Sequence, residues 1–389
     1  MVTRHQVENQ GQQERLNVKQ GWWNTAEGST GRLLQLCVGY FIFYVITGVT
    51  VKYFTGNASF GFPGMHEIEY LVYNTIGGNL IALSVAVFLR WYRIKSNHYI
   101  TIGRFKFPQE ILYIIPSGIC TAVVIPTTTL MYMLPISVMV AMVIMRASVI
   151  IISRVVDAVQ IKQGILTRHV YVEENYGVIF ALLAAAVNIF WVGPGDFDFV
   201  HSPAAVVILT SYIIAYAIRI YIMNYYKNTR PKGMKLDNNG FFAIEQIAAT
   251  TTMLLVAYIL FKTPEWFSSM NPEIALFKSS IENPHPYWGW GVIAGFAYGL
   301  VAFFSVFIFM FKGRTATFAG LVNRLTSLVA GTTATVVWWF AFGGKFPKVQ
   351  DWLSLVFILI AVWFLSRAEK KRTQELAAAK EIEVAPQKK

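Results

Sequence analysis

Long apolar runs separated by short polar segments dominate this chain from residue 33 to residue 366. Most runs are near the length that an α-helix needs, at about 1.5 Å of rise per residue, to cross about 30 Å of hydrocarbon. The predicted spans are 33–55, 68–91, 110–131, 133–158, 174–193, 204–226, 241–262, 287–311, 315–341 and 350–366. The pattern therefore predicts an all-α polytopic membrane protein with ten transmembrane helices.

The composition agrees with this interpretation. Of the 389 residues, 55% are hydrophobic and only 14% are charged. Soluble proteins average about 45–50% apolar and about 25% charged residues. These values exclude a disordered or collagen-like chain and argue strongly against a soluble enzyme.

Basic residues are divided unevenly between the two sides of the predicted membrane. The net charge of +12 first suggests a nucleic-acid partner. Of the 33 Lys and Arg residues, however, 25 lie in segments on one side of the ten spans. The other side has five, which are Lys52, Lys262, Lys278, Lys345 and Lys348. Because cytoplasmic loops carry the excess of positive charge, we expect both termini in the cytoplasm and no nucleic-acid partner. The cell (inner) membrane is the expected location, with a eukaryotic endomembrane as the alternative.

The chain contains a weak internal repeat. The fourth and fifth spans resemble the ninth and tenth, and Met145-Arg146-Ala147-Ser148 aligns with Asn323-Arg324-Leu325-Thr326. An odd number of spans in each half requires that the second half enters the membrane inverted, as in many secondary transporters. We expect two inverted five-helix halves and two cytoplasmic ends, at 33–193, 204–366, 1–32 and 367–389.

The stretch LMYMLPISVMVAMVIMRASVIIISRVVDAV resembles the drug/metabolite transporter superfamily, and its EamA-like or nucleotide-sugar-transporter-like solute carrier branch in particular. The match lies in the run Met145, Arg146, Ala147, Ser148 and Val149, which follows an LMY-like end of the third span. The layout of ten spans agrees with the same family. The resemblance implies a secondary transporter and leaves the substrate open.

Arg146 and Arg324 lie inside predicted spans, where a charge costs at least about 2.5–3.5 kcal/mol at the bilayer centre. Their positions along the two spans place them at similar depths. A guanidinium group stays charged and its fork suits a phosphate or carboxylate. We therefore expect the two arginines to bind an anionic substrate, with Asn323 and Thr326 as flanking hydrogen-bond partners. The alternative is that each arginine pairs with a carboxylate or with helix carbonyls.

Other polar residues in the spans suggest gating, coupling or packing. We expect Glu245 and Arg219 to be neighbours near the cytoplasm, either as an inner gate or proton-coupled pair, or as a static bridge. Asp157 is three residues from Arg154, so a local pair at the inner end of the fourth span is expected.

Three glycines recur at every fourth position of the eighth span and are expected to serve helix packing. They are Gly291, Gly295 and Gly299.

The sequence contains no phosphate-binding P-loop and no nucleophile elbow, so we expect no catalytic residues, cofactor or metal. Asp196 and Asp198 have a D-x-D spacing without a supporting acidic or histidine cluster, and suggest a solvated turn. The favoured function is secondary transport of a small, anionic organic metabolite. The alternatives are a translocase of lipids or lipid-linked headgroups on the same scaffold, and, with less support, an integral-membrane transferase. The expected partners are the small-molecule substrate and the lipid bilayer, and the chain could form a homodimer.

Overall fold

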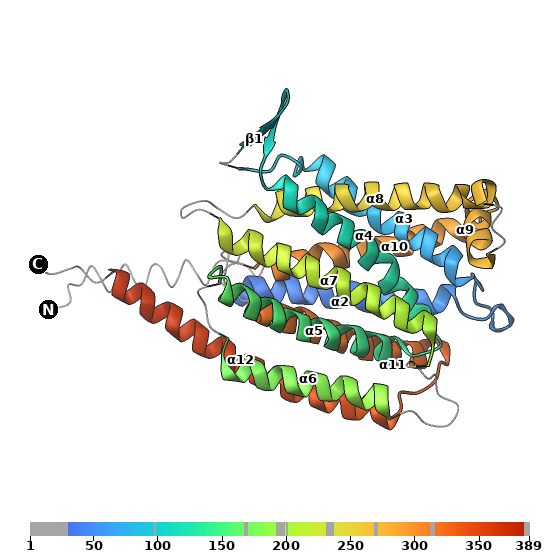
Figure 1. The fold of residues 1–389 in the computed structure, drawn as a ribbon. Helices are drawn as coiled ribbons and strands as arrows, with labels where there is room; N and C mark the ends of the chain where they lie inside the picture. The colour runs from blue at the N-terminus through green and yellow to red at the C-terminus, as the bar shows by residue number, and fades with distance from the viewer. Residues whose placement is uncertain are drawn as a thin grey trace, which may run out of the picture.

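The protein is a bundle of long helices that run roughly parallel, with a β-hairpin at one end (Figure 1). The structure is a computed structural model, and it describes residues 30–96, 99–166, 170–191, 199, 201–230, 237–267, 271–311 and 316–384. The first six elements are α2 (Thr30–Phe54), the 3-10 turn η1 (Ala58–Phe60), α3 (Glu67–Phe88), β1 (Tyr99–Ile102), β2 (Phe105–Pro108) and α4 (Ile111–Met133). They are followed by α5 (Val138–Lys162), α6 (Val172–Phe190), α7 (Pro203–Thr229), α8 (Asn238–Phe267), α9 (Pro272–Glu282), α10 (Trp288–Phe309), α11 (Ala316–Phe342) and α12 (Val349–Val384).

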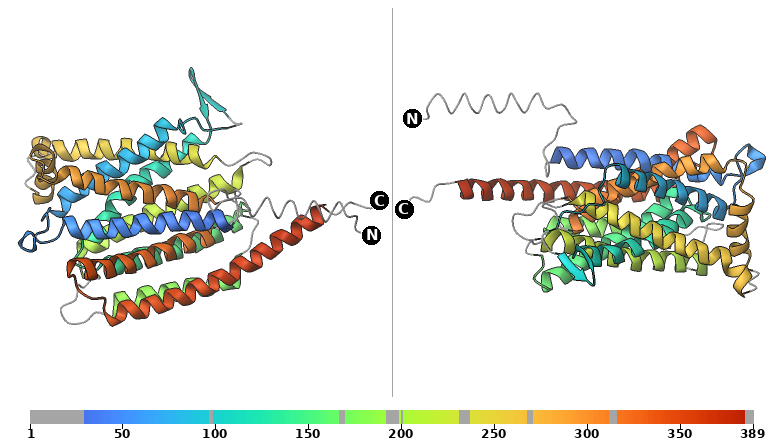
Figure 2. Two further views of the ribbon diagram at one scale, coloured as in Figure 1. Left: turned by 180° about the vertical axis from the view of Figure 1, so that it is seen from behind. Right: turned by 90° about the horizontal axis from the view of Figure 1, so that it is seen from above.

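The bundle has two ends, which successive long helices reach in alternation (Figures 1 and 2). We call the end where α2 begins and α12 finishes the terminal end, and the opposite end, where α9 lies, the far end. The antiparallel hairpin of β1 and β2 lies at the terminal end, and Gly103 takes a left-handed φ of 62° in its turn. The described parts of the predicted cytoplasmic loops therefore lie at the terminal end.

Capping residues mark the start of several of these helices. Ser137 precedes α5 and accepts a hydrogen bond from the backbone N–H of Val140. Ser202 precedes α7 in the same way, and Pro203 occupies the first helical position, where no N–H is required.

Nine helices within the described residues are long and apolar enough to cross a membrane. They are α2, α3, α4, α5, α7, α8, α10, α11 and α12. This result confirms a helical, polytopic, membrane-type architecture. α6 occupies the fifth predicted span as a helix of 19 residues, but it is not among the nine.

Apolar side chains cover parts of the outer surface as well as the core. On α8, Leu254 and Leu255 remain 65% and 61% exposed. Burying this surface in lipid tails removes it from water, which is the arrangement that a membrane-spanning helix requires.

α12 is longer than the tenth predicted span. The helix continues through the predicted charged tail to Val384, because residues 367–384 are rich in Ala, Glu, Lys and Arg, which are strong helix formers. Beyond the span it lies beside the start of α6, where Arg372 forms a buried 2.7 Å ion pair with Glu174. Lys371 forms a more exposed pair with Glu173.

The helices pack in matching pairs. α3 packs against α10 and α4 against α8, while α2 packs against α10 and α4 against α7. α5 packs against α11, and α6 against α12. The fourth predicted span thus lies beside the ninth and the fifth beside the tenth.

The glycines of α10 permit the closest of these contacts. A Cβ atom on Gly295 would lie 2.3 Å from the backbone oxygen of Asn74 on α3, and one on Gly299 would lie 2.4 Å from that of Gly78. A side chain on Gly291 would meet Tyr73 at 3.1 Å. These glycines therefore let the backbones of α3 and α10 touch.

Candidate functional site

Arg146 lies in the middle of α5 with no exposed surface. Its Nη1 donates a hydrogen bond of 2.5 Å to the hydroxyl of Tyr212 on α7. Its Nη2 donates to the hydroxyl of Tyr132 on α4 at 3.1 Å and to that of Tyr44 on α2. The guanidinium group is thus held by three tyrosines from three different helices.

Arg324 is also completely buried, in α11. None of its three guanidinium nitrogens has a hydrogen-bond partner among the described residues. The group lies over two aromatic rings instead, 4.6 Å from the centre of the Tyr216 ring and 5.2 Å from that of Phe309. Cation–π contacts stabilise a cation by about 0.5–2 kcal/mol each, but they leave the N–H donors free.

The two arginines flank the same pair of tyrosines on α7. Tyr212 accepts from Arg146, Tyr216 lies under Arg324, and the two tyrosine rings are 4.6 Å apart. Within the described part of the chain, neither arginine has an acidic partner within ion-pair distance. The centre of the bundle therefore holds two arginines surrounded by tyrosine hydroxyls and aromatic rings.

A small cavity of about 30 Å³ lies beside these groups. Its wall includes the hydroxyl-bearing side chains of α2, α4, α7 and α10, together with Arg219. The polar and aromatic lining residues are Tyr40, Tyr44, Thr121, Thr128, Tyr216, Tyr298 and Ser305. A liquid water molecule takes about 30 Å³, so the cavity has room for water but not for an organic solute.

Asn323 and Thr326 differ in how they use their polar atoms. The buried Asn323 accepts a hydrogen bond from Tyr40 at 3.0 Å and donates to Ser305 at 3.1 Å, and both partners line the cavity. Thr326 donates its hydroxyl proton to the carbonyl of Val322 on its own helix, at 2.8 Å. Asn323 thus reaches the cavity wall, whereas Thr326 forms the local bond that is common for threonine in a helix.

Arg219 and Glu245 form a buried ion pair between α7 and α8. Two parallel bonds of 2.9 and 2.8 Å join the guanidinium to the carboxylate, and Ser117 of α4 donates to the same carboxylate at 2.6 Å. Arg219 also lines the cavity, one turn closer to the terminal end than Tyr216. The expected neighbours are therefore in contact, and they link three helices.

The local pair expected between Arg154 and Asp157 is replaced by contacts to other helices. Arg154 donates to Asn175 on α6 at 3.1 Å. Asp157 accepts from Asn224 on α7 at 3.2 Å and from the backbone N–H of Thr317 at 2.6 Å. A carboxylate at the start of α11 stabilises the unpaired N–H groups and the positive end of that helix, which explains why Asp157 turns away from its own helix.

The tyrosines around Arg146 and Arg324 are not among the candidate site residues identified from the sequence. Their spacing along the chain nevertheless indicates that they share helix faces. Tyr40 and Tyr44 on α2 and Tyr212 and Tyr216 on α7 are each four residues apart, so each pair shares one helix face. The rings within the first pair are 4.8 Å apart. α2 and α7 are the first helices of the two predicted halves, so each half has a Y-x-x-x-Y pair on its first helix. α7 carries a second such pair, Tyr221 and Tyr225, nearer its end.

The described residues contain no cluster of three or more His, Cys, Asp or Glu side chains that could hold a metal ion. Asp196 and Asp198 lie outside the described residues.

Comparisons with known proteins add little about function. No protein-family model matches the sequence, and no curated protein matches it. Chains in solved structures do match. One of them, described only as "Crystal structure of protein", aligns with 88% of this chain and 100% of its own at 12% identity, with a TM-score of 0.48. A likeness at that score carries no argument, so the resemblance to the drug/metabolite transporter superfamily stays a prediction.

Proposed function

We propose that the protein is a secondary transporter that moves a small anionic organic solute across a membrane by alternating access. The observation that carries this proposal is the pair of fully buried arginines, Arg146 and Arg324, without an acidic partner among the described residues. An unpaired charge inside the membrane is costly and is found mainly where it serves a substrate or ion pathway. A guanidinium fork binds phosphate or carboxylate oxygens through paired hydrogen bonds.

The N–H groups of Arg146 that would bind a solute already donate to tyrosine hydroxyls. Tyr44, Tyr132 and Tyr212 accept its hydrogen bonds. The neighbouring cavity, which Tyr44 lines, is too small for an organic molecule. We assign this arrangement to a closed state. In the loaded state the oxygens of the anion replace the tyrosine hydroxyls on Arg146 and supply the partners that Arg324 lacks.

Matching helix contacts support an inverted repeat with halves at 33–193 and 204–366. Under exchange of α2 with α7, α3 with α8, α4 with α10, α5 with α11 and α6 with α12, the contact of α3 with α10 becomes that of α8 with α4, and the contact of α2 with α10 becomes that of α7 with α4. The pairs α5 with α11 and α6 with α12 map onto themselves. Arg146 and Arg324 then occupy related helices, as do the two tyrosine pairs. In this proposal α6 also crosses the membrane, which brings the number of spans to ten, and the solute binds between the halves.

The proposed orientation places the terminal end in the cytoplasm, because that end carries most of the basic loop residues. In the closed state the ion pair of Arg219 and Glu245 joins α7 to α8 at the cavity wall. It therefore belongs to the gate that must open for release to the cytoplasm.

Transport by purified protein in proteoliposomes tests the proposal. Solutes are first selected by their ability to stabilise the protein, from a panel of phosphorylated metabolites, nucleotide sugars, carboxylates, amines and lipid headgroups. Arg146→Ala should abolish uptake, and Arg146→Lys should be nearly as damaging, because an ammonium group cannot form paired hydrogen bonds. Lys162→Ala, at the exposed end of the same helix, is the matched control and should transport normally.

Normal uptake by a correctly folded Arg146→Ala variant would reject the assignment of the site. Movement of labelled lipid in place of soluble anions would favour a headgroup translocase.

A further inference from the structure

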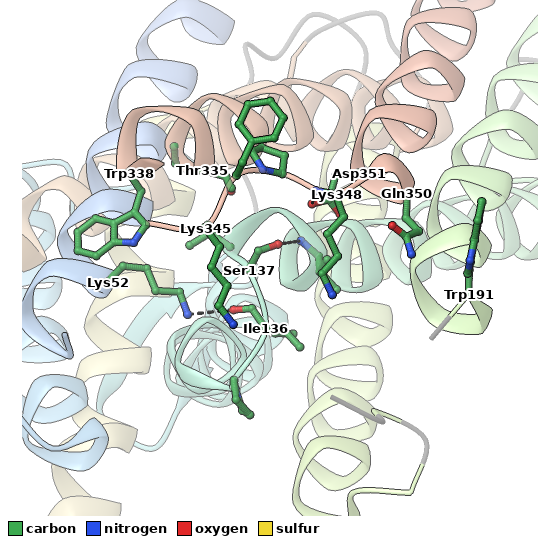
Figure 3. Close-up of a pocket in the computed structure, with 16 residues that line it drawn as sticks. Lys52, Ile136, Ser137, Trp191, Thr335, Trp338, Lys345, Lys348, Gln350 and Asp351 are labelled. Atoms are coloured by element: carbon green, nitrogen blue, oxygen red, sulfur yellow. Dashed lines mark hydrogen bonds between the residues drawn. The ribbon is translucent and has the colours of Figure 1, made fainter. Parts of the chain in front are cut away.

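A cavity of about 360 Å³ lies at the far end of the bundle (Figure 3). It is lined by the end of α2, the turn before α5, the end of α11 and the start of α12. At about 30 Å³ per water molecule, it has room for about a dozen waters or a small organic ion.

Positive charge is concentrated in this cavity. Three of the five basic residues on the lysine-poor side of the protein line it, which are Lys52, Lys345 and Lys348. The acidic group in its lining is Asp351, which accepts the backbone N–H of Lys348 at 3.0 Å. Two helices, α5 and α12, also begin at the cavity, and the start of a helix favours a bound anion.

Two of the lysines have ammonium groups placed to meet a ligand. Lys345 extends into the cavity and forms no hydrogen bond or ion pair with any residue that the structure describes (Figure 3). Lys52 donates to the backbone oxygens of Tyr132 and Ile136, at 2.9 and 3.0 Å. An ammonium group has three N–H donors, so Lys52 retains one for an anion.

The cavity lies closer to the far end than Arg146 does, and it is linked to Arg146 through α5 and α4. Val140 lines it, and Arg146 is six residues further along α5, about 9 Å of rise. The backbone that Lys52 holds belongs to Tyr132, whose hydroxyl accepts from Arg146.

A layer of small and flexible side chains packs around Gly48 of α2 and Gly331 of α11. A Cβ on Gly48 would lie 2.9 Å from Ala334 and 3.0 Å from Val138, and one on Gly331 would lie 2.7 Å from the sulfur of Met142.

We propose that this lysine pocket is an outer loading site that binds the anionic solute, through its phosphate or carboxylate group, before the solute reaches Arg146. The pocket concentrates anions at the far end, and the layer around Gly48 and Gly331 closes it from the centre. This role rests on the transport function proposed above, but the electrostatic character of the pocket can be measured without it.

The first experiment measures the charge of the pocket by thiol labelling. The full chain carries Gln350→Cys, with Cys37→Ser and Cys120→Ser to remove the other thiols. Anionic and cationic methanethiosulfonate reagents of similar size are compared, with millimolar inorganic phosphate as a competing ligand. The anionic reagent should react faster, phosphate should slow it, and Lys345→Gln should lower the anionic-to-cationic rate ratio about two- to fivefold, as expected for one exposed charge.

The matched control is Lys262→Gln, a lysine of the same end that lies outside the pocket lining. It should leave the rate ratio unchanged. Equal rates for both reagents, or the same ratio with Lys345→Gln, would overturn the pocket as an anion site.

The second experiment measures transport from the far-end side. Lys345→Gln should raise KM about two- to fivefold and leave kcat unchanged, because the pocket loads the solute without taking part in the crossing step. An unchanged KM would overturn the loading role. Arg146→Ala separates the two proposals: it should lose transport while the labelling ratio at the pocket stays high. If Arg146→Ala transports normally, the central site is wrong whatever the pocket does.

Discussion

The replacement of Arg324 by methionine tests whether this arginine is kept for function or for the fold. Burying a charge at the middle of a spanning helix costs about 2.5–3.5 kcal/mol. The rings of Tyr216 and Phe309 each stabilise the buried guanidinium by about 1 kcal/mol. No hydrogen bond to a described residue stabilises it further. Methionine fills a similar space without the charge, so Arg324→Met should be about 1 kcal/mol more stable than the native chain while transport is lost.

The same substitution at Arg219 should have the opposite effect on stability. Arg219→Met removes both hydrogen bonds from the buried carboxylate of Glu245 and should cost about 3–5 kcal/mol. Thermal unfolding of the purified variants in one detergent, followed by tryptophan fluorescence, measures both changes. If Arg324→Met is destabilised as strongly as Arg219→Met, Arg324 supports the fold and the reasoning about a functional charge is refuted.

Two further predictions concern the packing and the terminal end. Gly295→Leu should destabilise the fold by about 1–3 kcal/mol, because its side chain would overlap the backbone of α3, whereas Gly289→Ala has open space around it and should be neutral. Urea titration of both variants checks this, and equal stability would contradict the close contact of α3 and α10. Arg372→Ala leaves a buried carboxylate of α6 unpaired and should cost about 3–5 kcal/mol, whereas Lys371→Ala breaks a more exposed pair and should cost at most about 1 kcal/mol. Limited proteolysis of the end of α12 reports the difference, and equal cleavage rates would show that the buried pair does not hold that end.

Features that depend on one helix could be predicted from the sequence. Runs of apolar residues predict where the membrane-spanning helices lie, because a helix surrounded by lipid needs apolar side chains along its whole length. The spacing of Gly291, Gly295 and Gly299 predicts a face of close approach, and the structure places α3 against that face. Arg219 and Glu245 are expected to be neighbours because each lies near the same end of consecutive spans.

Features that depend on the register between distant helices could not be predicted. The partners of Arg146 come from α2, α4 and α7, and one of them lies 102 residues away in the chain. Asp157 was expected to pair locally, but its carboxylate meets the start of α11, 160 residues further on. Hydropathy and spacing say which face of a helix is polar, whereas the side chain that it meets is set by how two helices slide and turn against each other.

The central claim is that the bundle holds an anion at Arg146 and Arg324, and a ligand-stabilisation measurement tests it most directly. Purified protein is heated with matched panels of anionic, neutral and cationic metabolites, and its unfolding temperature is recorded. A ligand that binds the native state raises that temperature by mass action. The account predicts that stabilising ligands are anions and that Arg146→Lys and Arg324→Met each remove their effect. Stabilisation by cations alone, or by anions equally in both variants, would contradict it.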